Sequence, residues 1–236
     1  MNSIAQSFTT AITLISSFDG QLWSIVARSL LVSAWASLAA SVLGVVFGSW
    51  LAVSHFPGRG LVLLILNTLL SLPAVVVGLL VYLLLSRSGP LGELGWLFSV
   101  KAMVFAQTIL VLPVVMALVR QLIEDADQQR GEQLKSLGAP RLFRALLHVW
   151  DERLAVLMVL IAAFGRAIAE VGTVMVVGGN IDGFTRVMTT SIALETSKGD
   201  LPLALGLGII LMGVVLLLNA TLAGLRWLLA KQGGQS

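Results

Sequence analysis

The sequence QLIEDADQQRGEQLKSLGAPRLFRALLHVWDER, residues 121–153, decides the fold because it is the one densely charged stretch of a strongly hydrophobic chain. The chain has 15 Lys and Arg and 12 Asp and Glu, and residues 120–153 hold six of each kind. A charge at the centre of a bilayer costs roughly 2.5–3.5 kcal/mol, so this segment lies outside the hydrocarbon. Its leucines nevertheless recur at helical spacing, which predicts helix rather than loop; they are Leu134, Leu137, Leu142, Leu146 and Leu147.

The middle of this segment predicts a turn between two short helices. Gly138 suits the left-handed position that follows a helix C-terminus, and Pro140 suits the first turn of the next helix, where its missing N–H is no loss. Two short helices at an angle would form a rigid knob on the aqueous side of a membrane protein. The residues alone equally allow a solvated connector that contacts nothing.

The composition indicates a membrane protein. Hydrophobic residues make up 57% of the 236 positions and charged residues 11%, whereas a soluble domain carries about 25% charge. The absence of cysteine excludes disulfides and thiol chemistry, and His55 and His148 lie too far apart in sequence to suggest a metal cluster. The net charge of +3 comes mostly from loop arginines without a basic run, which argues against nucleic-acid binding. The first residues lack the basic region of a cleavable signal, so we expect the N-terminus to be retained.

The apolar runs predict five transmembrane helices in a single domain, residues 1–236. The expected spans are about 23–53, 61–85, 102–119, 154–177 and 201–229. Residues 1–22 form an N-terminal segment, either a short interfacial helix or a frayed end, 23–119 carry spans one to three, 120–153 form the charged region, and 154–229 carry spans four and five. The expected fold class is therefore an all-α polytopic membrane protein.

The distribution of Lys and Arg predicts the orientation of the chain. With the charged region in the cytoplasm, nine of these residues lie inside and five outside, as the positive-inside rule requires. Five spans then place the N-terminus outside and the C-terminus in the cytoplasm. No internal repeat at a fixed period occurs, which disfavours an inverted-repeat secondary transporter.

Three features within or between the spans are candidates for function. Arg166 and Glu170 are four residues apart, so they share a helix face and pair there, either as a structural ion pair or as part of a gate or substrate path. Pro73 frees backbone carbonyls in the second span, which fits a kink in a path or a simple packing kink. The helix expected over 189–196 starts with hydroxyls that suit an oxyanion, although ordinary capping explains them more simply.

A resemblance to a known family adds to this picture. Glu132-Gln133-Leu134, followed by Gly138, resembles the Glu-Ala-Ala…Gly loop of ABC importer membrane subunits, in which the loop forms a coupling helix that docks on a cytoplasmic ATPase. The match is partial, because Gln133 and Leu134 replace two alanines and His148, Trp150 and Asp151 stand where the family usually carries Ile-x-Leu-Pro. The resemblance implies a set of ATPase-coupling residues, with Leu142 and Phe143 as apolar anchors: Glu132, Leu134, Leu137, Gly138, Ala139, Leu142 and Phe143.

A second motif strengthens the resemblance. The sequence from Arg166 through Glu170 to Gly172 resembles the Arg-x-x-x-Glu-x-Gly that follows the coupling loop in many of these permeases. The sequence of residues 164–200 resembles those of the tungstate-type branch of the molybdate, tungstate and sulfate permeases. The candidate path or gate residues are Arg166, Glu170, Gly172, Asn180, Thr189, Thr190 and Pro73.

The resemblance implies a function and a set of partners. The expected protein is the permease subunit of an ATP-driven oxyanion importer with the type I importer fold, for tungstate or alternatively for molybdate or sulfate. It would form a homodimer in a prokaryotic inner membrane, with two ATPase subunits and an external binding protein. It would not be an enzyme and would bind no cofactor or metal, because no phosphate-binding Gly-x-x-x-x-Gly-Lys motif occurs and ATP-Mg would bind to the ATPase. The alternative from another class is an ATP-independent secondary carrier.

Overall fold

The computed structural model describes residues 2–233, and the side chains of residues 6–227. This part of the chain is helical and contains no strand, which confirms the expected all-α class. The elements are α1 (Asn2–Ser16), α2 (Gly20–Val53), α3 (Arg59–Leu70), α4 (Ala74–Leu85), the short 3-10 helix η1 (Gly92–Leu94), α5 (Val100–Ser136), α6 (Arg141–Asp151), α7 (Arg153–Ile168), α8 (Gly172–Gly178), α9 (Met188–Lys198) and α10 (Leu201–Gly233).

The helices provide up to five membrane spans. Among the described residues, α2, α5 and α10 are each long and apolar enough to cross a bilayer, and two bent helix pairs, α3 with α4 and α7 with α8, pass the same test when each pair is counted as one span. The prediction of about five spans is confirmed in this form. The second and fourth spans each consist of two helices separated by a bent break.

The breaks in these two spans have local causes. Helix α3 ends at Leu70 and α4 starts at Ala74, with Pro73 in extended conformation (φ −63°, ψ 128°) directly before α4. Proline cannot donate the hydrogen bond that would continue a helix, so the expected kink becomes a complete interruption. In the fourth span α7 ends at Ile168 and α8 starts at Gly172. The side chain of Glu170 accepts hydrogen bonds from the first backbone amides of α8, as described below.

The charged region differs from the expected pair of short helices. Its first helix is the end of α5, a 37-residue helix that contains Pro113 and continues without interruption to Ser136. The helix therefore continues past residue 119, the expected end of the third span. No proline lies between Arg120 and Ser136, so nothing in the backbone chemistry ends the helix at the membrane surface.

The turn after α5 follows the prediction for Gly138, which has a left-handed φ of +77°. The Ala139 N–H donates to the Leu134 carbonyl at 3.0 Å and the Gly138 N–H to the Lys135 carbonyl at 2.9 Å, the two bonds of a Schellman motif. Pro140 was expected in the first turn of the next helix. It instead lies one residue earlier, as the N-cap of α6, with φ −67° and ψ 156°.

The chain divides into two compact units. The first comprises Met1–Ala36, Pro73–Gln107 and Gly165–Asn219, and the second comprises Ser37–Leu72, Thr108–Phe164 and Ala220–Ser236. In the first unit α1 is a helix whose Ala11 is buried while Phe8 and Ile12 are exposed. In the same unit α4 packs closely on α8, since a Cβ on Gly78 would lie 3.0 Å from the Thr173 Cα.

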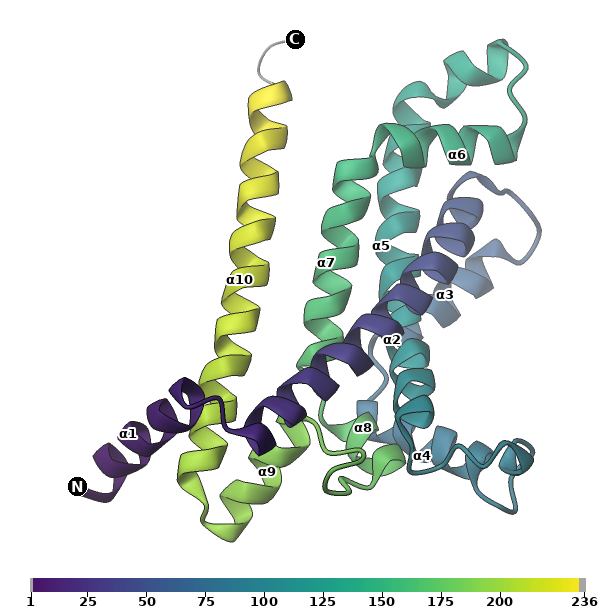
Figure 1. Ribbon diagram of the computed structural model, residues 1–236. Coiled ribbons are helices and arrows are strands. Elements are labelled where there is room, and N and C mark those ends of the chain that lie inside the picture. Colours follow the sequence, from purple (N-terminus) through teal and green to yellow (C-terminus); the bar gives the residue numbers. More distant parts are fainter. Residues whose placement is uncertain (1, 234–236) are drawn as a thin grey trace. The chain divides into compact units, whose positions relative to one another are not determined.

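In the second unit, α2 crosses α5 at two glycines (Figure 1). A Cβ on Gly44 would lie 2.6 Å from Val115 Cγ1, and one on Gly48 would lie 2.8 Å from the Met116 carbonyl oxygen. Small residues such as these glycines, spaced four apart, allow two membrane helices to approach closely.

A methyl group at Gly48 should therefore destabilise the protein. The Gly48→Ala variant must displace the α5 backbone, an overpacking cost of about 1–3 kcal/mol, and should lower the melting temperature in detergent. Gly60→Ala is the matched control, because nothing lies within 4 Å of a Cβ there. An unchanged melting temperature for Gly48→Ala would contradict the contact.

Candidate functional site

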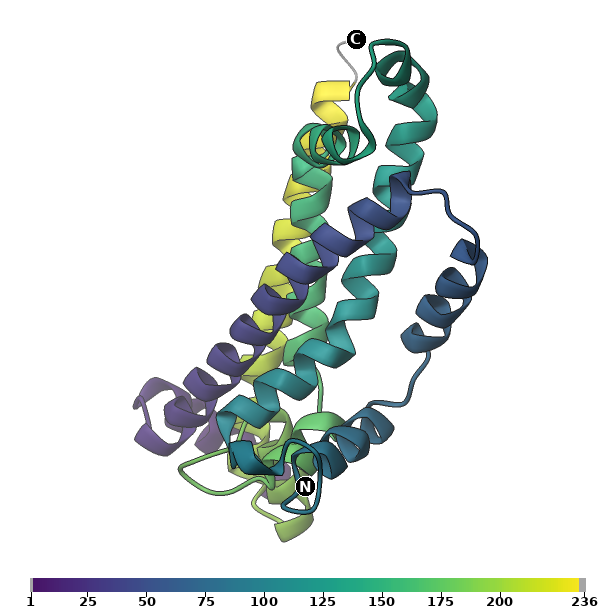
Figure 2. The ribbon, with the colours of Figure 1, turned by 90° about the vertical axis from the view of Figure 1, so that its right-hand side faces the viewer.

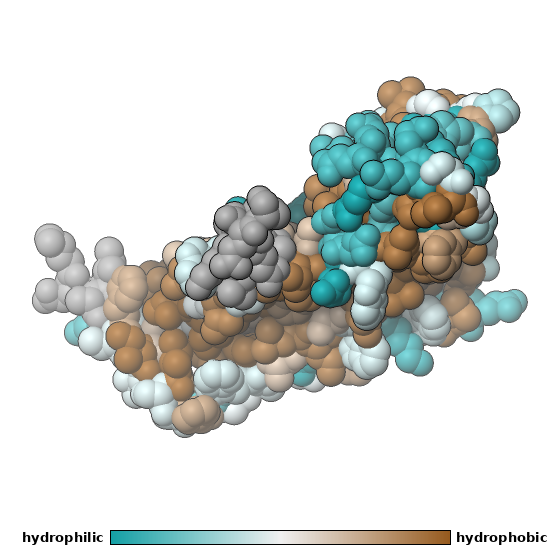
Figure 3. All heavy atoms as spheres, turned by 90° about the horizontal axis from the view of Figure 1, so that it is seen from above, coloured by the Kyte–Doolittle hydropathy of each residue, from teal (hydrophilic) through white to brown (hydrophobic). Residues whose placement is uncertain are grey.

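The end of α5, the turn at Gly138 and helix α6 form the charged region of the second unit. Helix α6 runs across the direction of α5 and α7 (Figure 1), and Figure 2 looks nearly along its axis. Hydrophilic residues gather over this region with apolar residues among them (Figure 3). The sequence-predicted coupling residues all lie on this helix pair or its turn.

Helix α6 has its polar and apolar faces inverted with respect to an ordinary surface helix. Its buried residues are Arg144, Ala145 and His148. Its outward face carries exposed apolar side chains from Leu142, Phe143, Leu146 and Trp150. Asp127 on α5 explains the inversion, because its carboxylate lies 3.1 Å from His148 Nε2 and 3.3 Å from Arg144 Nη1.

The predicted coupling residues occupy different environments within this region. Leu137 in the turn is 81% exposed, and Glu132 is exposed and pairs with Lys135 at 3.0 Å. Leu134 and Ala139 are half-buried. Three of the predicted residues are exposed: Leu137, Leu142 and Phe143. Two further exposed residues, Leu146 and Trp150, were not predicted from the sequence. The four-residue spacing of Leu142, Leu146 and Trp150 was the signal that could have identified them. We call these five residues the apolar tip.

The broken fourth span brings together the second set of predicted residues. Arg166 Nη1 lies 3.3 Å from Glu170 Oε2, which confirms the expected i, i+4 pair. Glu170 Oε1 also accepts hydrogen bonds from the backbone N–H groups of Gly172 at 2.9 Å and Thr173 at 3.3 Å. The buried Glu170 therefore caps α8, whereas the side chain of Arg166 is 48% exposed.

Neighbouring elements of the first unit satisfy the carbonyl groups freed at this break. Gln107 Nε2 donates to the Ala167 carbonyl at 3.0 Å, and the Thr189 hydroxyl donates to the Glu170 carbonyl at 2.7 Å. The hydroxyl of Thr173 donates to the Ala74 carbonyl at 2.8 Å, directly after Pro73. The two interrupted spans thus meet at their breaks.

The start of α9 holds the predicted hydroxyl residues in a buried position. The Met188 N–H donates to Ser29 Oγ at 2.6 Å, and Thr190 exchanges hydrogen bonds with the backbone of Val187. Asn180 has a positive φ of 50° and donates to the Thr190 carbonyl at 3.4 Å. In this conformation the hydroxyls of Thr189 and Thr190 bind protein groups, which fits helix capping better than an open oxyanion site.

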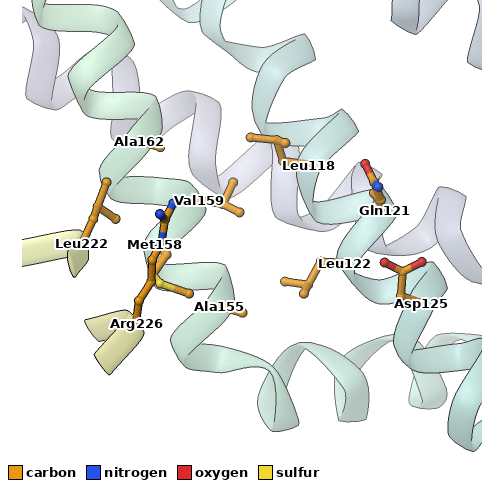
Figure 4. A pocket seen from close by; sticks show the side chains of 10 residues that line it. All are labelled: Leu118, Gln121, Leu122, Asp125, Ala155, Met158, Val159, Ala162, Leu222 and Arg226. Atoms are coloured by element: carbon orange, nitrogen blue, oxygen red, sulfur yellow. The ribbon is translucent and has the colours of Figure 1, made fainter. Parts of the chain in front are cut away.

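Open cavities lie next to these features in both units. In the first unit a cavity of about 690 Å³ is lined by Thr189, Asn219 and mainly apolar residues of the α7–α8 break, α9 and α10. In the second unit a cavity of about 400 Å³ lies among α5, α7 and α10 (Figure 4). Asp125 and Arg226 stand on opposite sides of it, so its walls carry no excess of either charge.

The asymmetry of the Arg166–Glu170 pair leads to a prediction. Glu170→Ala leaves two buried N–H groups and Arg166 without a partner, a loss of about 2 kcal/mol for hydrogen bonds to a charged group. Arg166→Ala removes only a half-exposed partner and should cost less. Melting temperatures in detergent should fall further for Glu170→Ala; the reverse order would show that the cap is unimportant.

Comparisons with known proteins identify the family. No protein-family profile matches the chain. The tungstate uptake system permease protein TupB of Peptoclostridium acidaminophilum is 38% identical over 226 residues, which cover 96% of this chain and 99% of that protein. TupB of Campylobacter jejuni is 37% identical over 93% of this chain and 92% of its own length. A probable anion ABC transporter permease protein of Haloferax volcanii is 40% identical over 84% of this chain and 88% of its own length.

These relatives span nearly the same length as the chain and are transport permeases rather than enzymes. Their similarity agrees with the apolar helices, which make the chain a multi-pass membrane protein. It also agrees with the two motifs at Glu132–Gly138 and Arg166–Gly172. The chain therefore belongs to the ABC transporter permease family, in the group that includes the tungstate uptake permeases.

Proposed function

We propose that the chain is the membrane-spanning permease subunit of an ATP-driven importer that carries tungstate into the cell. An external binding protein delivers the oxyanion, and the permease passes it inward by alternating between outward-open and inward-open states. Two copies of the chain form a homodimer in the inner membrane of a prokaryote, in contact with lipid. Two ATPase subunits bind ATP-Mg, and the permease binds no cofactor, metal or nucleic acid.

The observation that carries this proposal is the apolar tip on an otherwise charged region. Exposed leucine and aromatic side chains surrounded by charges mark a surface that binds a partner protein. An ATPase that receives Leu137, Leu142 and Phe143 in a cleft would remove them from water. The coupling residues Glu132, Leu134, Gly138 and Ala139 shape the turn that presents them. The tip lies on the cytoplasmic side, the N-terminus outside and the C-terminus in the cytoplasm.

The broken spans are the proposed gate. Helices interrupted inside a membrane protein are tolerated where their backbone faces protein or water, and such breaks mark transport sites. Around the break lie the candidate gate residues Arg166, Glu170, Gly172, Asn180, Thr189, Thr190 and Pro73. The cavity of about 690 Å³ that includes Thr189 is the proposed adjoining part of the path.

We propose tungstate as the substrate, rather than molybdate or sulfate, because two of the relatives are named tungstate uptake permeases. The three ions are divalent tetrahedral oxyanions and therefore resemble one another in charge and shape. In the proposed importer the external binding protein, which captures the ion first, sets most of the selectivity. The decisive experiment reconstitutes the permease with its ATPase and binding protein in vesicles and measures uptake of each ion. ATP-dependent tungstate uptake is expected. ATP-independent uptake by the permease alone, driven by an ion gradient, would favour the secondary carrier.

The left-handed backbone at Gly138 gives a test of coupling. Gly138→Val introduces a β-branched residue at φ +77°, which distorts the turn, so ATP hydrolysis should continue while transport falls. Gly138→Asn is the control, because asparagine tolerates this conformation better than other side chains. Coupled uptake by Gly138→Val equal to the wild type would refute this role of the turn.

The apolar tip gives a test of ATPase binding. Phe143 and Phe184 are both 55% exposed, but Phe184 lies in the connection between α8 and α9. Phe143→Ala should weaken the affinity for the ATPase at least tenfold, about 1.4 kcal/mol, while Phe184→Ala should leave it unchanged. Affinity measured between purified subunits in detergent checks this. Equal effects of both substitutions would rule out docking through the tip.

A further inference from the structure

Polar residues on one face of α5 connect this helix to other segments of the second unit. Glu124, Asp127 and Arg130 are three residues apart and lie along the same side of the helix. Each forms an ion pair outside α5. Together they make a line of contacts along about two turns of α5.

The middle contact of this line is the most buried. The side chain of Asp127 is 11% exposed, that of Arg144 4% and that of His148 0%. Both α6 side chains approach the same carboxylate oxygen, Oδ1. Arg144 Nη1 forms no aligned hydrogen bond there, so attraction between opposite charges holds this pair. Because the groups are shielded from water, salt weakens this attraction much less than it would at the surface.

The outer contacts fix the two ends of the same line. Arg130 reaches the far end of α6, where it lies 2.6 Å from Glu152 and 3.3 Å from Asp151. At the other end Glu124 pairs with Arg59 at 3.0 Å, which connects α5 to the start of α3.

These contacts hold α6 in place because its apolar packing is limited. Leu142, Phe143, Leu146 and Trp150 are exposed, Leu147 and Val149 are half-buried, and among the fully buried residues of α6 only Ala145 is apolar. The chain between α5 and α6 is a short turn around Gly138, whose hydrogen bonds fix the end of α5 but not the direction of α6. The orientation of α6 therefore depends on polar contacts with α5.

We propose that Asp127, Arg144 and His148 form a clasp of positioning residues that makes α6 move as one body with α5. This inference rests on the proposed function: a displacement of α6 by the ATPase would pass through the clasp into α5, which is one continuous helix from Val100 to Ser136. Without the clasp, α6 would tilt about the Gly138 turn and the displacement would be lost. The clasp contacts neither the oxyanion nor the nucleotide.

The test compares two arginines of the same helix in the reconstituted transporter. Arg144→Gln removes the buried charge, and Arg141→Gln removes an exposed charge three residues earlier. We expect Arg144→Gln to lower the number of tungstate ions transported per ATP hydrolysed at least fivefold while the permease still co-purifies with the ATPase. Arg141→Gln should keep the wild-type ratio. The exchanged pair, Asp127→Arg with Arg144→Asp, should recover at least half of the lost coupling.

The outcomes separate this inference from the function on which it rests. Absence of ATP-dependent uptake by the wild-type complex would overturn the proposed function itself. If the wild type couples normally, an unchanged ratio for Arg144→Gln, or an equal loss for Arg141→Gln, would overturn the clasp. Failure of Arg144→Gln and the exchanged pair to assemble, while Arg141→Gln assembles, would assign these residues to folding and would also overturn it.

Discussion

The hydrocarbon core of a membrane offers no hydrogen-bond partners, and this constraint governs the interrupted helices of the first unit. Each break frees backbone groups that must be paired within the protein. The Glu170 side chain accepts hydrogen bonds from backbone amides at the start of α8, while Gln107 and Thr189 donate to the carbonyls around the same break. The ionisable side chain of Glu170 is thus stabilised inside a span because it accepts hydrogen bonds from backbone amides. Its pairing with Arg166 is a second role.

The second unit uses polar contacts in a different way. Its α2–α5 crossing is built from glycines that allow close apolar approach, as in many membrane bundles. In α6, Arg144 and His148 are buried, whereas Leu142, Phe143, Leu146 and Trp150 are exposed. Buried ion pairs contribute little net stability compared with apolar packing, but they define one arrangement. Such a helix has a fixed direction and an apolar surface that remains available to a partner.

Much of this organisation could be predicted from the sequence. The hydrophobic composition predicted a membrane protein, and the conformational preference of Gly138 located the turn. The spacing of Arg166 and Glu170 predicted their pair. In each case the deciding information is local: a composition, a backbone preference or a helical spacing.

The remaining features depend on contacts between distant segments. The complete break at Pro73 is stabilised by Thr173, whose hydroxyl donates to the carbonyl of Ala74, 99 residues earlier in the chain. The burial of Arg144 depends on the contact of α6 with Asp127 of α5, so charge alone suggested a solvated face there. Leu146 and Trp150 were missed for the same reason, because their exposure follows from which side of α6 meets Asp127.

The apolar tip also has a consequence for biosynthesis. In the proposed importer, a permease made without its ATPase leaves Leu137 and the exposed side chains of α6 in contact with water. Exposed apolar patches of this kind promote self-association and attract chaperones and proteases. On that proposal, the lifetime of the unassembled subunit in the cell depends on balanced synthesis of permease and ATPase.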